Sequence, residues 1–195
     1  LLATGARKNL TTAAWSRRRN ELPAVTGFTV ERTEGSTVVA LVDHEPGLDP
    51  FVGLRPAQDR QRWTARKEAG GWLLNPDPRI EMLYPPAGDA PPAALDWAQA
   101  VQRCDQAGAR RLEGVDVLFG TTDGPARLCR VTGALSAGRP ERLPAGPASQ
   151  ELVGQYGAEV LTWARSVRIT GGERPFHAVL APIGSVWRVV GVFEP

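Results

Sequence analysis

An α+β fold, with helices packed on curved antiparallel sheets, is predicted by three features of the sequence. Segments in which apolar and polar residues alternate, a pattern typical of half-buried strands, occur in both halves of the chain. Each half also contains a run with apolar residues at helical spacing. Clusters of glycine and proline separate these segments at short intervals, which favours hairpins over long crossover connections.

The composition is that of a folded globular chain. Of the 195 residues, 42% are hydrophobic and 23% are charged. Disordered chains typically have fewer hydrophobic residues and a higher net charge, so a folded core is expected. The formal net charge is only +2, and the one dense basic cluster, Arg17, Arg18 and Arg19, is closely followed by Glu21. Nucleic-acid binding is therefore not expected. The longest apolar run, at 186–193, is too short to cross a bilayer. Frequent arginine, alanine, glycine and proline indicate a GC-rich bacterial genome.

The first half is expected to begin with a helix and to continue as strands. Pro23 ends the predicted helix, because proline lacks the amide hydrogen that a helix interior needs. Glu34 and Gly35 form the predicted turn of a hairpin, and Gly70 with Gly71 forms a second turn. The predicted elements are a helix at 3–22, a hairpin at 28–42, a loop at 43–56, and strands at 61–67 and 72–74.

A proline-rich segment divides the chain. Its six prolines, in a stretch that also holds the short apolar piece 80–84, mark a boundary between compact units. We expect an N-terminal unit at 1–84, built from a helix and an antiparallel sheet, a linker at 85–92 and a C-terminal unit at 93–195. A single domain spanning 1–195 is the alternative. The prolines are Pro76, Pro78, Pro85, Pro86, Pro91 and Pro92.

The second half is also expected to combine helices with hairpins. Proline is well suited to the first turn of a helix, so Pro91 and Pro92 precede a predicted helix start. Ser149 is a favourable N-cap for a second helix of about five turns, which Gly171 and Gly172 would end. The predicted elements are helices at 93–107 and 149–167, strands at 115–119, 126–131, 176–181 and 185–193, and a loop at 133–147.

Each half places a tryptophan at the start of a late apolar strand, after a turn that contains glycine. These residues are Trp72, after Gly70 and Gly71, and Trp187, after Gly184. A helix leading into a curved sheet that closes with such a hairpin resembles the NTF2-like (cystatin-like) superfamily. That superfamily includes extracytoplasmic bacterial domains associated with transport and conjugation machinery. The resemblance covers 10–74 and 97–194 and implies a tandem pair, although the first half has one helix where the family pattern has about three.

Two cysteines, Cys104 and Cys129, allow two interpretations. They pair as a disulfide in an oxidising compartment, or they are buried thiols in a reducing one. The chain also begins at Leu1 without an initiator methionine, which suggests that an upstream signal or anchor segment has been removed. These observations favour an extracytoplasmic location, secreted or membrane-anchored. A cytoplasmic location is the alternative.

The sequence contains no recognisable catalytic motif. His44 and His177 are the only histidines, and each is interpreted as a surface or hydrogen-bonded structural residue. Enzymes of the resembled superfamily hold acid and base residues inside a cone formed by sheet and helices. The resemblance implies His177, Tyr156 and Asp116 as candidates for such a pocket, and otherwise no catalytic residue.

Metals and cofactors are not expected. Asp43, Glu45 and Asp49 lie close together in sequence, but their spacing does not match the twelve-residue calcium loop. Neither cysteine lies in a zinc-binding pattern.

The expected function is that of a non-enzymatic extracytoplasmic binding or assembly module that acts through protein–protein contacts. Its partner would be another protein or a second copy of the chain. The alternative is a small-molecule-binding or isomerase/cyclase-type protein that uses a cone-shaped pocket. An exposed apolar patch beside a filled core favours the first function, and a deep pocket with convergent polar groups favours the second.

Overall fold

The computed structural model describes residues 24–45, 47–49, 53–75, 77–119, 129, 132–158, 160–172 and 174–193, with the backbone alone at 47–49, 53–55, 115, 116, 118, 119 and 148. These residues form an α+β chain in which strands predominate. The chain divides into two compact units, residues 1–84 and 85–195. The helix predicted at 3–22, the arginine cluster at 17–19 and nearly all of the strand predicted at 126–131 lie outside the described residues.

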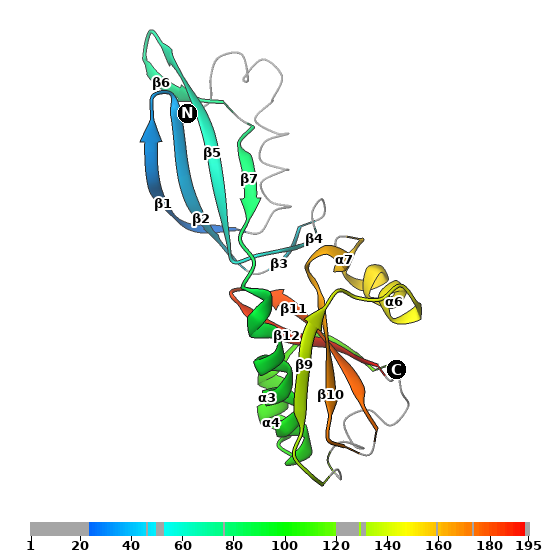
Figure 1. Ribbon diagram of the computed structural model, residues 1–195. Helices are drawn as coiled ribbons and strands as arrows, with labels where there is room; N and C mark the ends of the chain where they lie inside the picture. The colour runs from blue at the N-terminus through cyan, green and yellow to red at the C-terminus, as the bar shows by residue number, and fades with distance from the viewer. Residues whose placement is uncertain are drawn as a thin grey trace. The chain divides into compact units, whose positions relative to one another are not determined.

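Unit 1 contains a five-stranded antiparallel sheet. The strand order is β1-β2-β5-β6, and β7 pairs with a different segment of β5 than β6 does. β1, drawn in blue, is the outer strand of this sheet (Figure 1). The strands are β1 (Val25–Glu34), β2 (Thr37–His44), β5 (Gln58–Glu68), β6 (Gly71–Leu74) and β7 (Arg79–Met82).

The hairpin predicted at 28–42 is confirmed as β1 and β2. Its turn contains Gly35, whose φ of 57° lies in the left-handed region that glycine adopts without strain. The prediction of an unstructured loop at 43–56 is wrong, because this segment contains a two-stranded ladder. β3 (Gly47–Asp49) and β4 (Gly53–Arg55) pair antiparallel there. Such a short ladder lacks an alternating pattern long enough to be recognised in sequence.

Unit 2 contains a five-stranded mixed sheet in the order β8-β12-β11-β10-β9. β8 runs parallel to β12, and the other neighbouring strands are antiparallel. The strands predicted at 115–119, 176–181 and 185–193 are confirmed within longer or slightly shifted elements. The strands are β8 (Glu113–Phe119), β9 (Ser136–Glu141), β10 (Arg165–Thr170), β11 (Phe176–Ile183) and β12 (Val186–Phe193).

The helices of unit 2 begin after a short 3-10 turn, η1 (Ala87–Asp89). α3 (Ala90–Gln102) starts three residues earlier than predicted and contains Pro91 in its first turn, where a missing amide hydrogen costs nothing. Cys104 then interrupts the helical segment with a φ of 57°, and α4 (Gln106–Leu112) follows as a separate helix. The single helix predicted at 93–107 is therefore two helices joined by a sharp turn.

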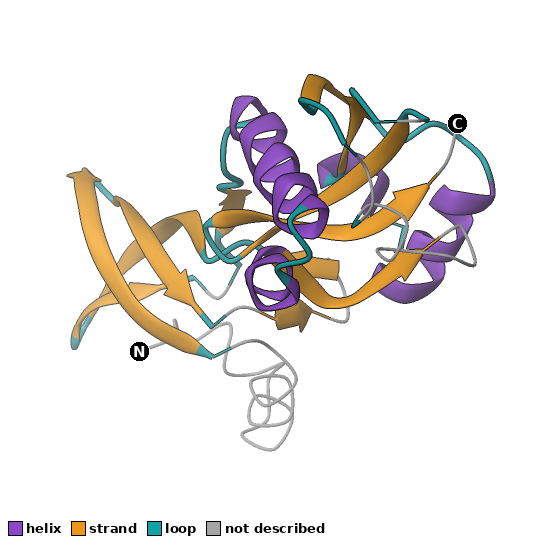
Figure 2. Ribbon diagram, turned by 90° about the horizontal axis from the view of Figure 1, so that it is seen from below, coloured by secondary structure: helices purple, strands orange, loops and turns teal. Residues whose placement is uncertain are grey.

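Side chains fill the space between α3 and the sheet of unit 2. Trp97 is fully buried in this cluster and meets Phe176 edge to face, with 6.4 Å between the ring centroids. Its indole N–H donates a 2.9 Å hydrogen bond to Glu113. Figure 2 shows α3 lying against the strands of this unit. The sheet contributes Val167, Ile169, Phe176, Ala178, Leu180, Trp187 and Val189 to the cluster.

The helix predicted at 149–167 is wrong beyond its first half. α6 (Pro147–Tyr156) ends at Gly157, whose φ is 82°, and only the short α7 (Val160–Trp163) follows. Residues 165–170 form β10 between β9 and β11, and the alternate positions Val167 and Ile169 are buried in the core. The spacing of the apolar residues here is compatible with a helix and with a strand. Pairing with the neighbouring strands of the sheet favours the strand.

The N-terminus of α6 also differs from the prediction. Gly146 is the N-cap, and Ser149 lies at the third helical position. The Ser149 hydroxyl accepts a hydrogen bond from the Gly146 N–H and donates one to the Gly146 carbonyl. Ser149 therefore fixes the start of the helix without being its N-cap.

The loop predicted at 133–147 is wrong in part, because it contains β9. This strand lies at an edge of the sheet, and among the described strands it pairs with β10 alone. Gly138 and Pro140 suggested a loop in sequence, but an edge strand tolerates proline because its outward side needs no ladder hydrogen bond.

Replacing Trp97 with alanine is expected to lower the free energy of unfolding by about 3 to 5 kcal/mol, because a fully buried indole is removed. Chemical denaturation of the full chain measures the loss. The matched control is Trp72→Ala, which removes a mostly exposed indole and should change stability by about 0.5 kcal/mol or less. Equal losses for the two variants would contradict the described core.

Candidate functional site

The most distinctive exposed surface of the described residues is the edge strand β1. Among the described pairings its ten residues bond to β2 on one side only. Nine of the ten residues are exposed, and three of these carry large apolar side chains. Phe28 is 71% exposed, Val25 60% and Val30 50%. Isolated apolar residues are common on surfaces, but three of them along one strand edge form a patch.

The pairing of β1 with β2 shows which way these side chains point. Residues opposite one another in an antiparallel pair share a face of the sheet. Val25 lies opposite His44, Phe28 opposite Val42, and Val30 opposite Ala40. A register shift between Val25 and Gly27 keeps the three apolar residues on one face despite their uneven spacing. We call Val25, Phe28 and Val30 the β1 patch.

The centre of the same face contains a buried polar cluster. The His44 Nε2 lies 2.8 Å from Asp59 Oδ2, and the Gln61 amide donates a 2.8 Å hydrogen bond to Asp59 Oδ1. The side chains of His44 and Asp59 are 2% and 0% exposed. The His44 Nδ1 has no described partner. The contact between His44 and Asp59 links β2 to β5 in the buried part of the sheet.

Asp59 was not identified from the sequence. The sequence places Asp43 next to His44, but these neighbours on β2 point to opposite faces of the sheet. The structure pairs Asp43 instead with Gln58, whose amide donates a 2.8 Å hydrogen bond to it. The contact between His44 and Asp59 can be predicted only when the pairing of β2 with β5 is known, which places residues 37–43 opposite residues 58–64.

The opposite face of this sheet is charged. Arg60 on β5 donates hydrogen bonds of 2.8 Å to Glu31 on β1 and of 2.9 Å to Glu81 on β7. The hydrogen bond from Arg60 holds the pKa of the Glu31 carboxyl below its ordinary value. These exposed ion pairs contribute little stability, but they keep this face hydrophilic.

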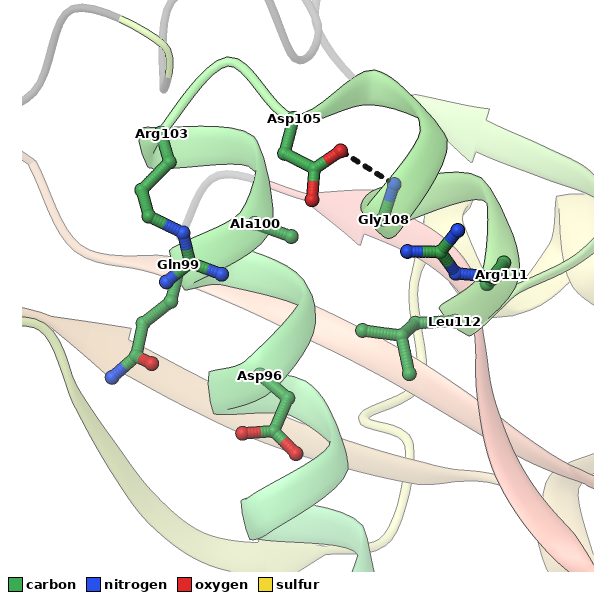
Figure 3. Close-up of a pocket in the computed structure, with 8 residues that line it drawn as sticks. All are labelled: Asp96, Gln99, Ala100, Arg103, Asp105, Gly108, Arg111 and Leu112. Carbon is green, nitrogen blue, oxygen red and sulfur yellow. Dashed lines mark hydrogen bonds between the residues drawn. The ribbon is translucent and has the colours of Figure 1, made fainter.

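Unit 2 has an open pocket between α3 and α4 with a volume of about 310 Å³ (Figure 3). The Asp105 carboxylate accepts a 2.8 Å hydrogen bond from the Gly108 N–H, which caps α4. Figure 3 shows the Arg111 side chain directed toward the gap between the helices. Asp96 and Arg103 bring charges of both signs to the rim. This arrangement offers polar contacts but no nucleophile paired with a base.

A second pocket of about 390 Å³ lies beside the first and shares Asp96 and Leu112 with it. Val186 and Trp187 at the start of β12 give this pocket an apolar wall. The Trp187 indole N–H donates a 2.9 Å hydrogen bond to the Pro86 carbonyl, so the tryptophan anchors the chain before η1. Both pockets border the packed cluster, since Ala100 lines the first and Trp187 lines the second.

The three residues implied by the family resemblance lie on different elements. His177 on β11 is half-buried, and its Nδ1 lies 3.0 Å from the Ser166 hydroxyl. Tyr156 ends α6 and meets Trp163 edge to face at 6.1 Å. Asp116 is described by its backbone on β8, which β12 separates from β11. None of the interactions described for His177 and Tyr156 joins them to each other.

Cys104 and Cys129 are joined by a disulfide, with 4.9 Å between their Cα atoms. No three described His, Cys, Asp or Glu residues lie close enough together to hold a metal ion. Of the acidic residues near His44, the structure describes the side chains of Asp43 and Glu45 but not that of Asp49. Within the described part of the chain, no helix is long and apolar enough to cross a membrane.

No protein-family model matches the chain, and no curated protein matches it. The NTF2-like resemblance therefore stays a prediction.

Replacing Asp59 with alanine is expected to lower the free energy of unfolding by about 3 to 5 kcal/mol, because it leaves His44 and Gln61 buried without their common partner. Chemical denaturation of the full chain measures the effect. Asp77→Ala is the control, since Asp77 is exposed in the same unit. If both variants were as stable as the wild type, the buried cluster would not hold the sheet together.

Proposed function

We propose that this protein is a non-enzymatic extracytoplasmic binding module that acts through protein–protein contacts, and that its docking element is the free edge of β1. The observation that carries the proposal is the exposure of the β1 patch along an edge strand of ten residues. An edge strand offers a row of backbone N–H and C=O groups to which another strand can bond.

The first part of β1 lacks two of the features by which edge strands avoid association, namely charge and proline. Natural edges are commonly protected by charged residues, proline or a very short strand. Residues 25–30 contain no charge and no proline, and the charged residues Glu31, Arg32 and Glu34 come only afterwards. Backbone hydrogen bonds would provide affinity for a partner strand, and the β1 patch would provide specificity.

The packing of unit 2 supports a binding role over catalysis. In the NTF2-like resemblance, an enzyme would keep a pocket between helix and sheet. Here Trp97 and its neighbours occupy that space, and the candidate residues His177 and Tyr156 have other partners. The alternative, a small-molecule or isomerase-type function in a cone-shaped pocket, has only the open pockets beside α3 in its favour.

An extracytoplasmic location is supported by the pairing of Cys104 with Cys129. Closing this loop would stabilise the fold by about 3 kcal/mol in the chain-entropy model. Because the two cysteines are paired, protein prepared from an oxidising compartment and unfolded without reductant should show no titratable thiols. Two titratable thiols would remove this support.

The docking role of β1 can be tested with a random peptide library displayed on phage. Selected peptides should be extended and apolar, and their affinity for the double variant Phe28→Lys, Val30→Lys should fall at least tenfold. The control Trp72→Lys, Leu161→Lys introduces the same charges at exposed apolar positions outside β1 and should bind the peptides as the wild type does. Equal binding to all three proteins would contradict the proposal.

A further inference from the structure

We propose that the partner of β1 is a second copy of this chain, and that two β1 strands pair antiparallel about a twofold axis at Thr29. This inference rests on the proposed function, in which the β1 edge accepts a strand. It adds the identity of the partner and the register of the pairing. The resulting dimer would join two unit 1 sheets into one continuous sheet.

The β1 side chains fall on two faces that the pairing with β2 defines. Thr29 lies opposite Leu41, on the face that also holds Arg60. The β1 patch and Thr33 lie on the other face, with the buried cluster. The residues of this second face and their β2 partners are Val25 with His44, Phe28 with Val42, Val30 with Ala40, and Thr33 with Val38.

The strand is symmetric about Thr29 in the residues of this face. Phe28 and Val30 flank Thr29 at one position on either side, and Val25 and Thr33 lie four positions away on either side. Antiparallel pairing on Thr29 thus places Phe28 of each copy opposite Val30 of the other, and Val25 opposite Thr33. Aromatic side chains opposite β-branched ones are favourable cross-strand pairs.

The neighbouring registers do not place Phe28 of one copy opposite Val30 of the other. A shift by one residue would place Phe28 opposite Thr29 or Thr29 opposite Val30, which lie on different faces. Pairing centred on Phe28 would place Val25 opposite Glu31, and pairing centred on Val30 would place Phe28 opposite Arg32. Of these registers, only the one centred on Thr29 pairs Phe28 with Val30 and places no charged residue opposite the β1 patch.

The charges of β1 are compatible with this register. Glu31 would lie opposite Gly27 of the other copy, and Arg32 opposite Thr26. No two like charges would face each other, which an antiparallel pair must avoid. Glu31 would also keep its hydrogen bonds to Arg60, because these lie within one copy.

The register can be tested by cross-linking a single introduced cysteine in the full chain. Thr29→Cys should form a disulfide-linked dimer under mild oxidation, since the two cysteines would face each other at the axis. Thr33→Cys is the matched control, because Thr33 is an exposed threonine on the same strand. In the proposed dimer the two copies of residue 33 would be about 27 Å apart at 3.4 Å per residue, so this variant should remain uncross-linked.

Sedimentation of the wild type and of the double variant Phe28→Lys, Val30→Lys completes the test. The wild type should associate reversibly to a dimer as its concentration rises, and the variant should remain a monomer with unchanged circular dichroism. A monomeric wild type that still binds β1-directed peptides would overturn the inference and leave the proposed function standing. Dimerisation that the variant retains, or cross-linking of Thr33→Cys as efficient as that of Thr29→Cys, would also overturn it.

Discussion

An open antiparallel sheet must satisfy the backbone N–H and C=O groups of its outermost strand with water or with another strand. The sheet of unit 1 ends at β1, a ten-residue strand whose described pairings satisfy only one side. The sheet of unit 2 solves the same problem differently. Its edge strand β9 contains Gly138, Arg139, Pro140 and Glu141, which disfavour addition of another strand. The β1 edge and the β9 edge therefore have opposite tendencies toward association.

The two units also differ in how they are stabilised. Unit 2 packs α3 onto its sheet around Trp97, so its apolar core is closed by its own elements. In unit 1 the buried apolar side chains of the described strands are Val39, Ala40 and Val42, and the neighbouring positions hold His44, Asp59 and Gln61. A polar cluster of this kind fixes strand register through directional hydrogen bonds but contributes less than apolar packing. Covering the β1 patch with a second strand would add apolar burial where this unit has little.

The sequence correctly predicts those elements whose local pattern agrees with their tertiary surroundings. The β1–β2 hairpin and the strands β11 and β12 alternate clearly and are bounded by glycine turns, and they were predicted correctly. Residues 165–167 belong to β10 and not to the predicted helix, because β-branched residues at helical spacing also fit a strand and pairing with β9 and β11 decides between them. The His44–Asp59 contact was missed for the same reason, since its two residues meet through strand pairing and not through sequence proximity. The exposure of Phe28 was likewise hidden, because alternation does not reveal which strand lies at the edge of a sheet.

In the proposed dimer, the outward backbone groups of β1 are free in the monomer and bonded when two copies meet. Amide hydrogen exchange of the unmodified protein, followed residue by residue at low and high protein concentration, measures this property directly. We expect β1 amides that point away from β2 to exchange rapidly in dilute solution and to become protected as the concentration rises, with protection centred on Thr29. Exchange in β1 that is slow in dilute solution, or that does not change with concentration, would show that two β1 strands do not pair.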